Sequence, residues 1–205
     1  MSKPSPSIAA LRSEFGTAIE RHLVSSGQTI VYLSRDRSHD VLAWLRDTPG
    51  QEFNYLTDVT AVDYRDPERS LEVVYQLRSL GRRADLRVKI GLDKRGPLEL
   101  ASVYDLWRGA DWLEREVFDM FGVSFTGHPD LRRILMWETY AEGHPLRKDF
   151  PLRGHFSRAE QTRQALAANP EAHYSLEELS IAEASSELPK DMQERLARGE
   201  RGFLK

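Results

Sequence analysis

The sequence of 205 residues contains no cysteine. Iron–sulfur clusters are held mainly by cysteine thiolates, and many structural zinc sites need several cysteines. Disulfide bonds are excluded for the same reason. We therefore expect no redox cofactor within this chain.

Long apolar runs are missing as well. No stretch approaches the roughly 18 apolar residues that mark a membrane-spanning helix. The chain begins Met-Ser-Lys-Pro-Ser-Pro, and the apolar core of a signal peptide does not follow. We expect an untargeted chain that reaches a membrane only through partners.

An excess of positive charge is also absent. The chain has 29 Lys and Arg against 32 Asp and Glu, which gives a net charge of -3. Nucleic-acid-binding proteins normally carry a basic excess or a basic stripe. Binding to nucleic acid is therefore not expected.

The sequence motifs of common catalytic sites are missing too. There is no Gly-x-Gly-x-x-Gly, no phosphate loop with Gly-Lys-Ser/Thr and no Gly-x-Ser-x-Gly. His128 and His144 each precede a proline, in a turn typical of an imidazole that hydrogen-bonds nearby backbone or carboxylate. A metal-dependent hydrolase that uses these two histidines stays open as an alternative. Its candidate ligands would be His128, His144, His155, Asp130, Glu142 and Asp149.

Helical and strand patterns alternate over the first half of the chain. Apolar residues at helical spacing predict a helix over residues 7–27, and a second helix is expected from Ser38 until Pro49 stops it. The expected strands cover residues 29–33, 53–64, 71–78, 86–92 and 98–103. This order predicts an α+β core domain over residues 7–122, a two-layer arrangement with its helices packed on a mixed, largely antiparallel sheet.

The two ends of the chain have a different composition. Residues 1–6 are expected to form a flexible leader. From residue 156 onward the chain is polar, with alternating charges and few large apolar groups. Such a segment buries too little apolar area to order itself. We expect an extended C-terminal arm over residues 156–205, with one helix near 187–198, which is either disordered or laid over a partner.

The densest stretch in aromatic, charged, histidine and proline residues runs from Trp112 to Pro151. Its first part has helical spacing and ends at Phe121, because Gly122 is suited to a left-handed C-terminal cap. Arg115 is four residues from both Asp111 and Asp119, so ion pairs along the helix are expected. Glu114 and Glu116 point apart on a helix, which argues against a paired-carboxylate acid–base site. Because aromatic side chains lie on two faces, one face either completes the core or meets another protein.

After this helix the chain repeats a short pattern. Gly127-His128-Pro129-Asp130-Leu131-Arg132-Arg133 is echoed by Gly143-His144-Pro145-Leu146-Arg147-Lys148, which continues as Asp149-Phe150-Pro151. Residues 123–155, with these two Gly-His-Pro turns, are called the signature segment below.

These blocks, together with Glu114-Arg115-Glu116-Val117-Phe118-Asp119-Met120-Phe121-Gly122, resemble the signature of the 30 kDa subunit of complex I, the proton-translocating NADH:quinone oxidoreductase. The resemblance covers some forty residues in the same order. It implies a non-catalytic scaffold subunit of the peripheral arm that docks against the 49 kDa quinone-site subunit.

The resemblance also implies where the chain works. The FMN and iron–sulfur clusters would belong to partner subunits, and the chain would lie peripherally at the cytoplasmic face of a bacterial plasma membrane. The residues expected at the interface are Trp112, Glu114, Arg115, Glu116, Phe118, Asp119, His128, Arg132, Arg133, His144, Arg147, Lys148 and Asp149.

Two further alternatives remain from the sequence. One is the equivalent subunit of a related membrane-bound hydrogenase, or of a quinone oxidoreductase with another electron donor. The other is an isolated binding module outside any membrane complex.

Overall fold

The computed structural model describes residues 6–66 and 69–168. The chain divides into two compact units, one that ends at His155 and one that begins at Phe156. Residues 1–5 of the expected leader lie outside the described residues, as do the expected helix near 187–198 and the arm from residue 169 on.

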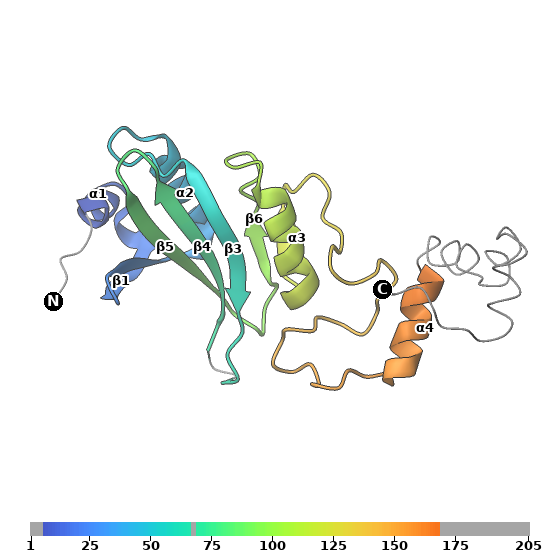
Figure 1. Ribbon diagram of the computed structural model, residues 1–205. Coiled ribbons are helices and arrows are strands. Elements are labelled where there is room, and N and C mark those ends of the chain that lie inside the picture. Colours follow the sequence, from blue (N-terminus) through green and yellow to red (C-terminus); the bar gives the residue numbers. More distant parts are fainter. Residues whose placement is uncertain (1–5, 67–68, 169–205) are drawn as a thin grey trace, which may run out of the picture. The chain divides into compact units, whose positions relative to one another are not determined.

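A five-stranded sheet forms the centre of the first unit, with the strand order β1-β2-β5-β4-β3 (Figure 1). Only β2 and β5 pair in parallel, and the other neighbours are antiparallel. The prediction of a mixed, largely antiparallel sheet is therefore confirmed. Its strands are β1 (Ile19–Ser25), β2 (Gln28–Leu33), β3 (Tyr55–Val62), β4 (Leu71–Ser79) and β5 (Ala84–Leu92).

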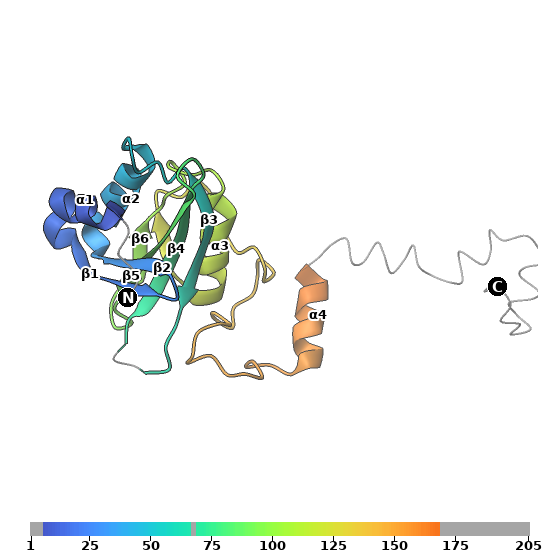
Figure 2. The same ribbon diagram turned by 60° about the vertical axis from the view of Figure 1, so that its left-hand side comes forward.

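One face of this sheet carries the apolar core. Along β4, Val73 and Tyr75 are buried in it, whereas Glu72 and Gln76 alternate with them and bond Lys89 and Arg87 of β5. Three helices bury apolar side chains in the same core: α1 (Pro6–Phe15), α2 (Ser38–Asp47) and α3 (Ala110–Phe121). Helix α1 lies beside β1, and α3 lies along β3 at the other end of the sheet (Figures 1 and 2). The predicted α+β class, with helices packed on a sheet, is confirmed.

The predicted helix over residues 7–27 is wrong in its second half. Helix α1 ends at Phe15, because Gly16 takes a φ of 38° and begins the short 3-10 helix η1 (Gly16–Ala18). The chain then continues as β1, which turns into β2 through Ser26 and Gly27 with φ values of 50° and 78°. Two consecutive positive φ angles are typical of a tight hairpin turn. Ser26-Gly27 is thus a hairpin turn between strands, and not the end of a helix.

A second, two-stranded sheet flanks α3. Strand β6 (Glu99–Ala101) pairs in parallel with β7 (Ser124–Thr126), and α3 connects the two. The expected strand at 98–103 therefore exists but does not join the five-stranded sheet. Because β7 follows α3 directly, this pairing fixes where the signature segment begins.

Helix α3 ends as the sequence predicts. Gly122 has a φ of 78°, and its N–H donates to the carbonyl oxygen of Phe118 at 2.9 Å. The helix starts later than its apolar spacing indicates, at Ala110, although Trp107 before it is buried in the core.

The remaining helices are the 3-10 helix η2 (Arg35–Arg37) and, in the second unit, α4 (Arg158–Ala168). Helix α4 buries no side chain, and an ion pair joins Arg163 to Glu160 at 2.7 Å. Among the described residues no helix is both long enough and apolar enough to cross a bilayer.

Candidate functional site

The signature segment has no regular secondary structure beyond β7, and it runs beside α3 (Figure 1). Backbone groups in irregular chain still need hydrogen-bond partners when they are buried. Here they find them mainly in side chains of α3. The site is therefore built as an irregular segment fastened to a helix.

The carboxylate of Asp119 makes the densest set of these contacts. Its side chain is fully buried, and one of its oxygens accepts the backbone N–H groups of Ile134, Leu135 and Met136 at 3.1, 2.8 and 2.8 Å. The other oxygen pairs with the guanidinium of Arg133 at 2.6 Å. Burial alone raises the pKa of a carboxyl group. The N–H of Met136, then Arg133, Leu135 and Ile134, overcome that effect and hold the pKa of Asp119 below its ordinary value.

Arg115 fastens the same stretch from its carbonyl side. Its guanidinium donates to the carbonyl oxygens of Arg132 and Arg133, both at 3.2 Å. The ion pair expected between Arg115 and Asp119 is therefore replaced, since Arg133 takes the carboxylate and Arg115 takes backbone. Spacing along the helix could not indicate this, because the competing partner lies in the segment that folds over it.

The two Gly-His-Pro turns place their imidazoles on α3. His128 donates from Nε2 to the carbonyl oxygen of Asp111 at 3.1 Å and accepts the N–H of Asp130 at Nδ1, also at 3.1 Å. His144 donates from Nδ1 to the carbonyl oxygen of Asp119 at 3.0 Å. The prediction that these imidazoles hydrogen-bond nearby backbone is confirmed. Because both nitrogens of His128 are occupied within the chain, this side chain is not available as a metal ligand.

Gly122 leaves the space in which the ring of His144 lies. A Cβ atom at position 122 would come within 2.6 Å of the His144 ring, closer than real Cβ contacts allow. The ring also packs edge-on against Phe118 at 6.2 Å between centroids. Gly122 therefore serves both the helix cap and the second Gly-His-Pro turn.

The end of the signature segment is fastened to other parts of the domain. The N–H of Leu146 donates to the carbonyl oxygen of Met120 at 3.1 Å, and that of Lys148 donates to the carboxylate of Asp63, beyond β3, at 2.8 Å. Lys94 pairs with the same carboxylate at 2.7 Å. Sequence reasoning missed Asp63, because nothing in its surroundings links it to residue 148.

Glu114 faces inward, away from the signature segment. It is fully buried, and its two oxygens accept the hydroxyl of Ser102 at 2.6 Å and the N–H of Val103 at 2.7 Å. Burial raises the pKa of Glu114 to about 7, although these two hydrogen bonds lower it, and Asp105 and Asp111 raise it further. Glu114 thus joins α3 to the chain after β6 with a proton affinity unusual for a carboxyl group.

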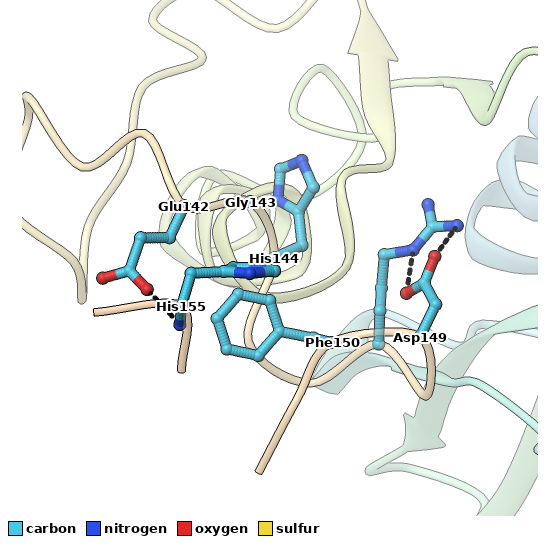
Figure 3. Close-up of a pocket in the computed structure, with 7 residues that line it drawn as sticks. Glu142, Gly143, His144, Asp149, Phe150 and His155 are labelled. Atoms are coloured by element: carbon cyan, nitrogen blue, oxygen red, sulfur yellow. Dashed lines mark hydrogen bonds and ion pairs between the residues drawn. The ribbon is translucent and has the colours of Figure 1, made fainter. Parts of the chain in front are cut away.

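A cavity of about 290 Å³ opens at the second Gly-His-Pro turn. Figure 3 shows Glu142 and Asp149 on opposite sides of Phe150, whose ring packs edge-on against His155 at 5.2 Å. Asp149 is occupied by Arg147, at 3.1 and 3.2 Å, and Glu142 accepts the N–H of His155 at 2.7 Å. The walls of the cavity therefore largely bond one another. Its lining residues are Glu142, Gly143, His144, Arg147, Asp149, Phe150 and His155.

The residues expected at an interface fall into two groups. Those exposed to solvent are Trp112, Glu116, Arg132, Lys148 and Asp149, and for them the interface stays a prediction. The remaining ones are buried or half-buried and contact their own chain: Glu114, Arg115, Phe118, Asp119, His128, Arg133, His144 and Arg147. Over residues 6–66 and 69–168, no group of three or more His, Asp or Glu side chains is arranged to hold a metal ion.

Comparison with known proteins identifies the family. Residues 31–156 match the family described as respiratory-chain NADH dehydrogenase, 30 kDa subunit. The chain belongs to this family. Its likeness to the NADH-quinone oxidoreductase C-subunit 2 of Rhizobium etli is 42% identity over 153 residues, which are 75% of this chain and 80% of that protein. Its likeness to the NADH-quinone oxidoreductase C-subunit of Roseiflexus sp. is 46% identity over 69% of this chain and 80% of that protein.

Solved structures agree with this assignment. A trypsin-resistant fragment (1–134) of Nqo5 is 33% identical, with a TM-score of 0.52 over 60% of this chain and 98% of that one. A chain of the membrane-bound sulfane sulfur reductase, an archaeal respiratory membrane complex, is 22% identical, with a TM-score of 0.60 over 77% of this chain and 89% of that one. The second likeness shows the fold alone. The predicted membership of the NADH:quinone oxidoreductase subunit family is confirmed.

The contacts of Asp119 predict a large cost for removing its carboxylate. Asp119→Ala should lower the free energy of unfolding by about 3–5 kcal/mol, because it leaves a half-buried arginine and three N–H groups without their acceptor. Asp130→Ala is the matched control, since Asp130 also pairs with an arginine, at 2.7 Å, but is exposed. Urea unfolding of both variants followed by circular dichroism measures the difference. Equal stability of the two would contradict the assigned contacts.

The close approach of His144 predicts that Gly122 is less replaceable than a comparable glycine. Gly122→Ala and Gly127→Ala share the strain of a positive φ, at 78° and 86°, but a Cβ at position 127 meets nothing within 4 Å. We expect Gly122→Ala to cost about 1–3 kcal/mol more. Chemical denaturation of both variants tests this, and His144→Ala should remove most of the extra cost. An extra cost that persists without His144 would show that the clash is not its cause.

The buried carboxyl of Glu114 predicts a pH-dependent stability. Its folded pKa is raised from 4.5 to about 7, so its contribution is fully present below pH 4.5 and is lost as the pH rises to about 7. Glu114→Gln stays neutral and should therefore gain up to roughly 3 kcal/mol relative to the wild type across this window. Urea titrations from pH 4.5 to 8 measure it, with the exposed Glu116→Gln as control. A difference between Glu114→Gln and wild type that does not change with pH would place the proton elsewhere.

Proposed function

We propose that this chain is a non-catalytic scaffold subunit of the proton-translocating NADH:quinone oxidoreductase. It docks through α3 and the signature segment against the 49 kDa quinone-site subunit in the peripheral arm. Its contribution to the transfer of electrons from NADH to quinone is the rigid placement of that partner.

The exposed apolar side chains of this region are the observation that carries the proposal. Trp112 on α3 is 70% exposed, and Ile134, Leu135, Leu146 and Leu152 of the signature segment are exposed as well. Scattered single apolar residues are normal on a surface, but a concentration in one segment marks an interaction site. Since the backbone beneath them is hydrogen-bonded to α3, these side chains are held ready to meet a partner.

The setting of the chain follows from this function. The FMN and iron–sulfur clusters belong to partner subunits, because a chain without cysteine offers no thiolate for a cluster. The chain acts in a hetero-oligomer and lies at the cytoplasmic face of a bacterial plasma membrane, held there by its partners.

The equivalent subunit of a related complex is the second candidate. The fold is shared with a chain of the archaeal sulfane sulfur reductase, so the fold does not separate the two. Identities of 42% and 46% to NADH-quinone oxidoreductase subunits favour the NADH-linked complex. Purification of the assembly from its own cells tests this choice. Subunits that bind flavin and oxidise NADH support the proposal, whereas a hydrogenase or another donor-linked subunit in their place contradicts it.

The exposed apolar residues predict a loss of assembly without a loss of folding. Trp112→Ser and Leu152→Ser should each lower recovery of the assembled complex and its NADH:quinone reductase activity by roughly tenfold, as expected for interface anchors. Leu80→Ser is the control, since Leu80 is exposed in the connection between β4 and β5. Native electrophoresis measures assembly, and the melting temperature of the isolated chain should stay unchanged. Normal assembly of both variants would remove the support for this docking surface.

A further inference from the structure

The bend at Ile134 and Leu135 is apolar on its outer side and anchored on its inner side. The N–H groups of residues 134, 135 and 136 all point to one oxygen of the buried Asp119. Met136 packs against the core, whereas Ile134 and Leu135 are 37% and 61% exposed. The same short stretch therefore has a fixed backbone and a pair of branched aliphatic side chains in solvent.

A fixed backbone changes what these side chains contribute to binding. Ordering a flexible loop on association opposes binding, and a loop that is already held avoids this cost. Arg115 and Arg133 hold the residues just before the bend, through the carbonyl oxygens of Arg132 and Arg133 and through Asp119. Apolar side chains on so rigid a support are suited to fill a recess of matching shape.

We propose that Ile134 and Leu135 are the central apolar anchor of the docking surface and insert into an apolar recess of a partner protein. This inference rests on the proposed function, and it names the residues that dominate the contact. Interfaces of this kind commonly depend on a few side chains that become fully buried.

The charges beside the bend indicate the chemistry of that partner. Arg132 is neutralised by Asp130 at 2.7 Å and also feels the charge of Glu138. On α3, the exposed Glu116 lies one helical turn before Asp119. Arg115 and Arg133 are occupied by contacts within the chain. The rim of the bend is therefore acidic, which fits a recess with a basic rim.

The same rim argues against two other occupants. An anionic lipid surface attracts basic segments and repels acidic ones. A second copy of this chain would bring one acidic rim against another, which is unfavourable. A different protein with a basic rim fits better than either.

The test uses the full chain in cells that make the complex. A variant with both Ile134→Ser and Leu135→Ser should reduce the fraction of the chain in the assembled complex by on the order of tenfold or more. Leu80→Ser is the matched control, because Leu80 is 58% exposed, close to the 61% of Leu135. The isolated double variant should keep the wild-type melting temperature, since the altered side chains are at least partly in solvent. Unfolding of the isolated double variant would overturn the inference, because the two side chains would then belong to the core.

The other outcomes separate this inference from the function on which it rests. If the double variant assembles normally while Trp112→Ser and Leu152→Ser do not, the anchor lies elsewhere and the docking function stands. If all three assemble normally, both proposals fail. Binding of the isolated chain to vesicles of phosphatidylglycerol and phosphatidylcholine that the double variant loses would assign the bend to lipid and overturn the inference. Self-association in the ultracentrifuge that the double variant loses would assign the bend to a second copy, with the same result.

Discussion

The buried carboxylate of Asp119 is the constraint on which the arrangement of the signature segment depends. It joins a helix inside the domain to a stretch of chain that has no regular structure of its own. Three backbone N–H groups and one guanidinium converge on it. A buried charge is tolerated only when it is paired and hydrogen-bonded, and the irregular segment supplies both. The acid thus gains its partners from the segment, and the segment gains its conformation from the acid.

Helix α3 can serve as this support because both of its ends are fixed. The β6–α3–β7 unit closes a small parallel sheet around it, and Gly122 turns the chain from α3 toward β7. The two Gly-His-Pro turns then place one imidazole on the carbonyl of Asp111 and the other on that of Asp119. The internal echo seen in the sequence therefore has a physical basis, since the same turn is used twice to reach the same helix. Proline favours extended backbone at each histidine, which lets the ring reach across to α3.

The sequence predicts local features of this fold well and its long-range polar contacts poorly. The alternation in β4 and β5, and the glycine after Phe121, are local signals, and each is confirmed. The strand β1 was predicted as helix, because Ile19 and Leu23 fit both periods and only pairing with β2 decides between them. Likewise Asp63 contacts residue 148, and Arg133 contacts Asp119, across stretches of chain that no local pattern connects. Topology supplies these pairs, so a single sequence without it cannot.

The same distinction bears on what the signature itself means. Its charged residues suggest a surface made for a partner, yet Arg115, Arg133 and Asp119 spend their bonding capacity inside the chain. What makes the segment recognisable as a family signature is thus largely the network that holds its shape. The residues left to meet another protein are the plain ones between those contacts, Ile134 and Leu135 above all, whose side chains are exposed because the backbone N–H groups of both are turned inward. A signature rich in charge can therefore present an apolar contact, since the charges serve to hold the backbone that carries it.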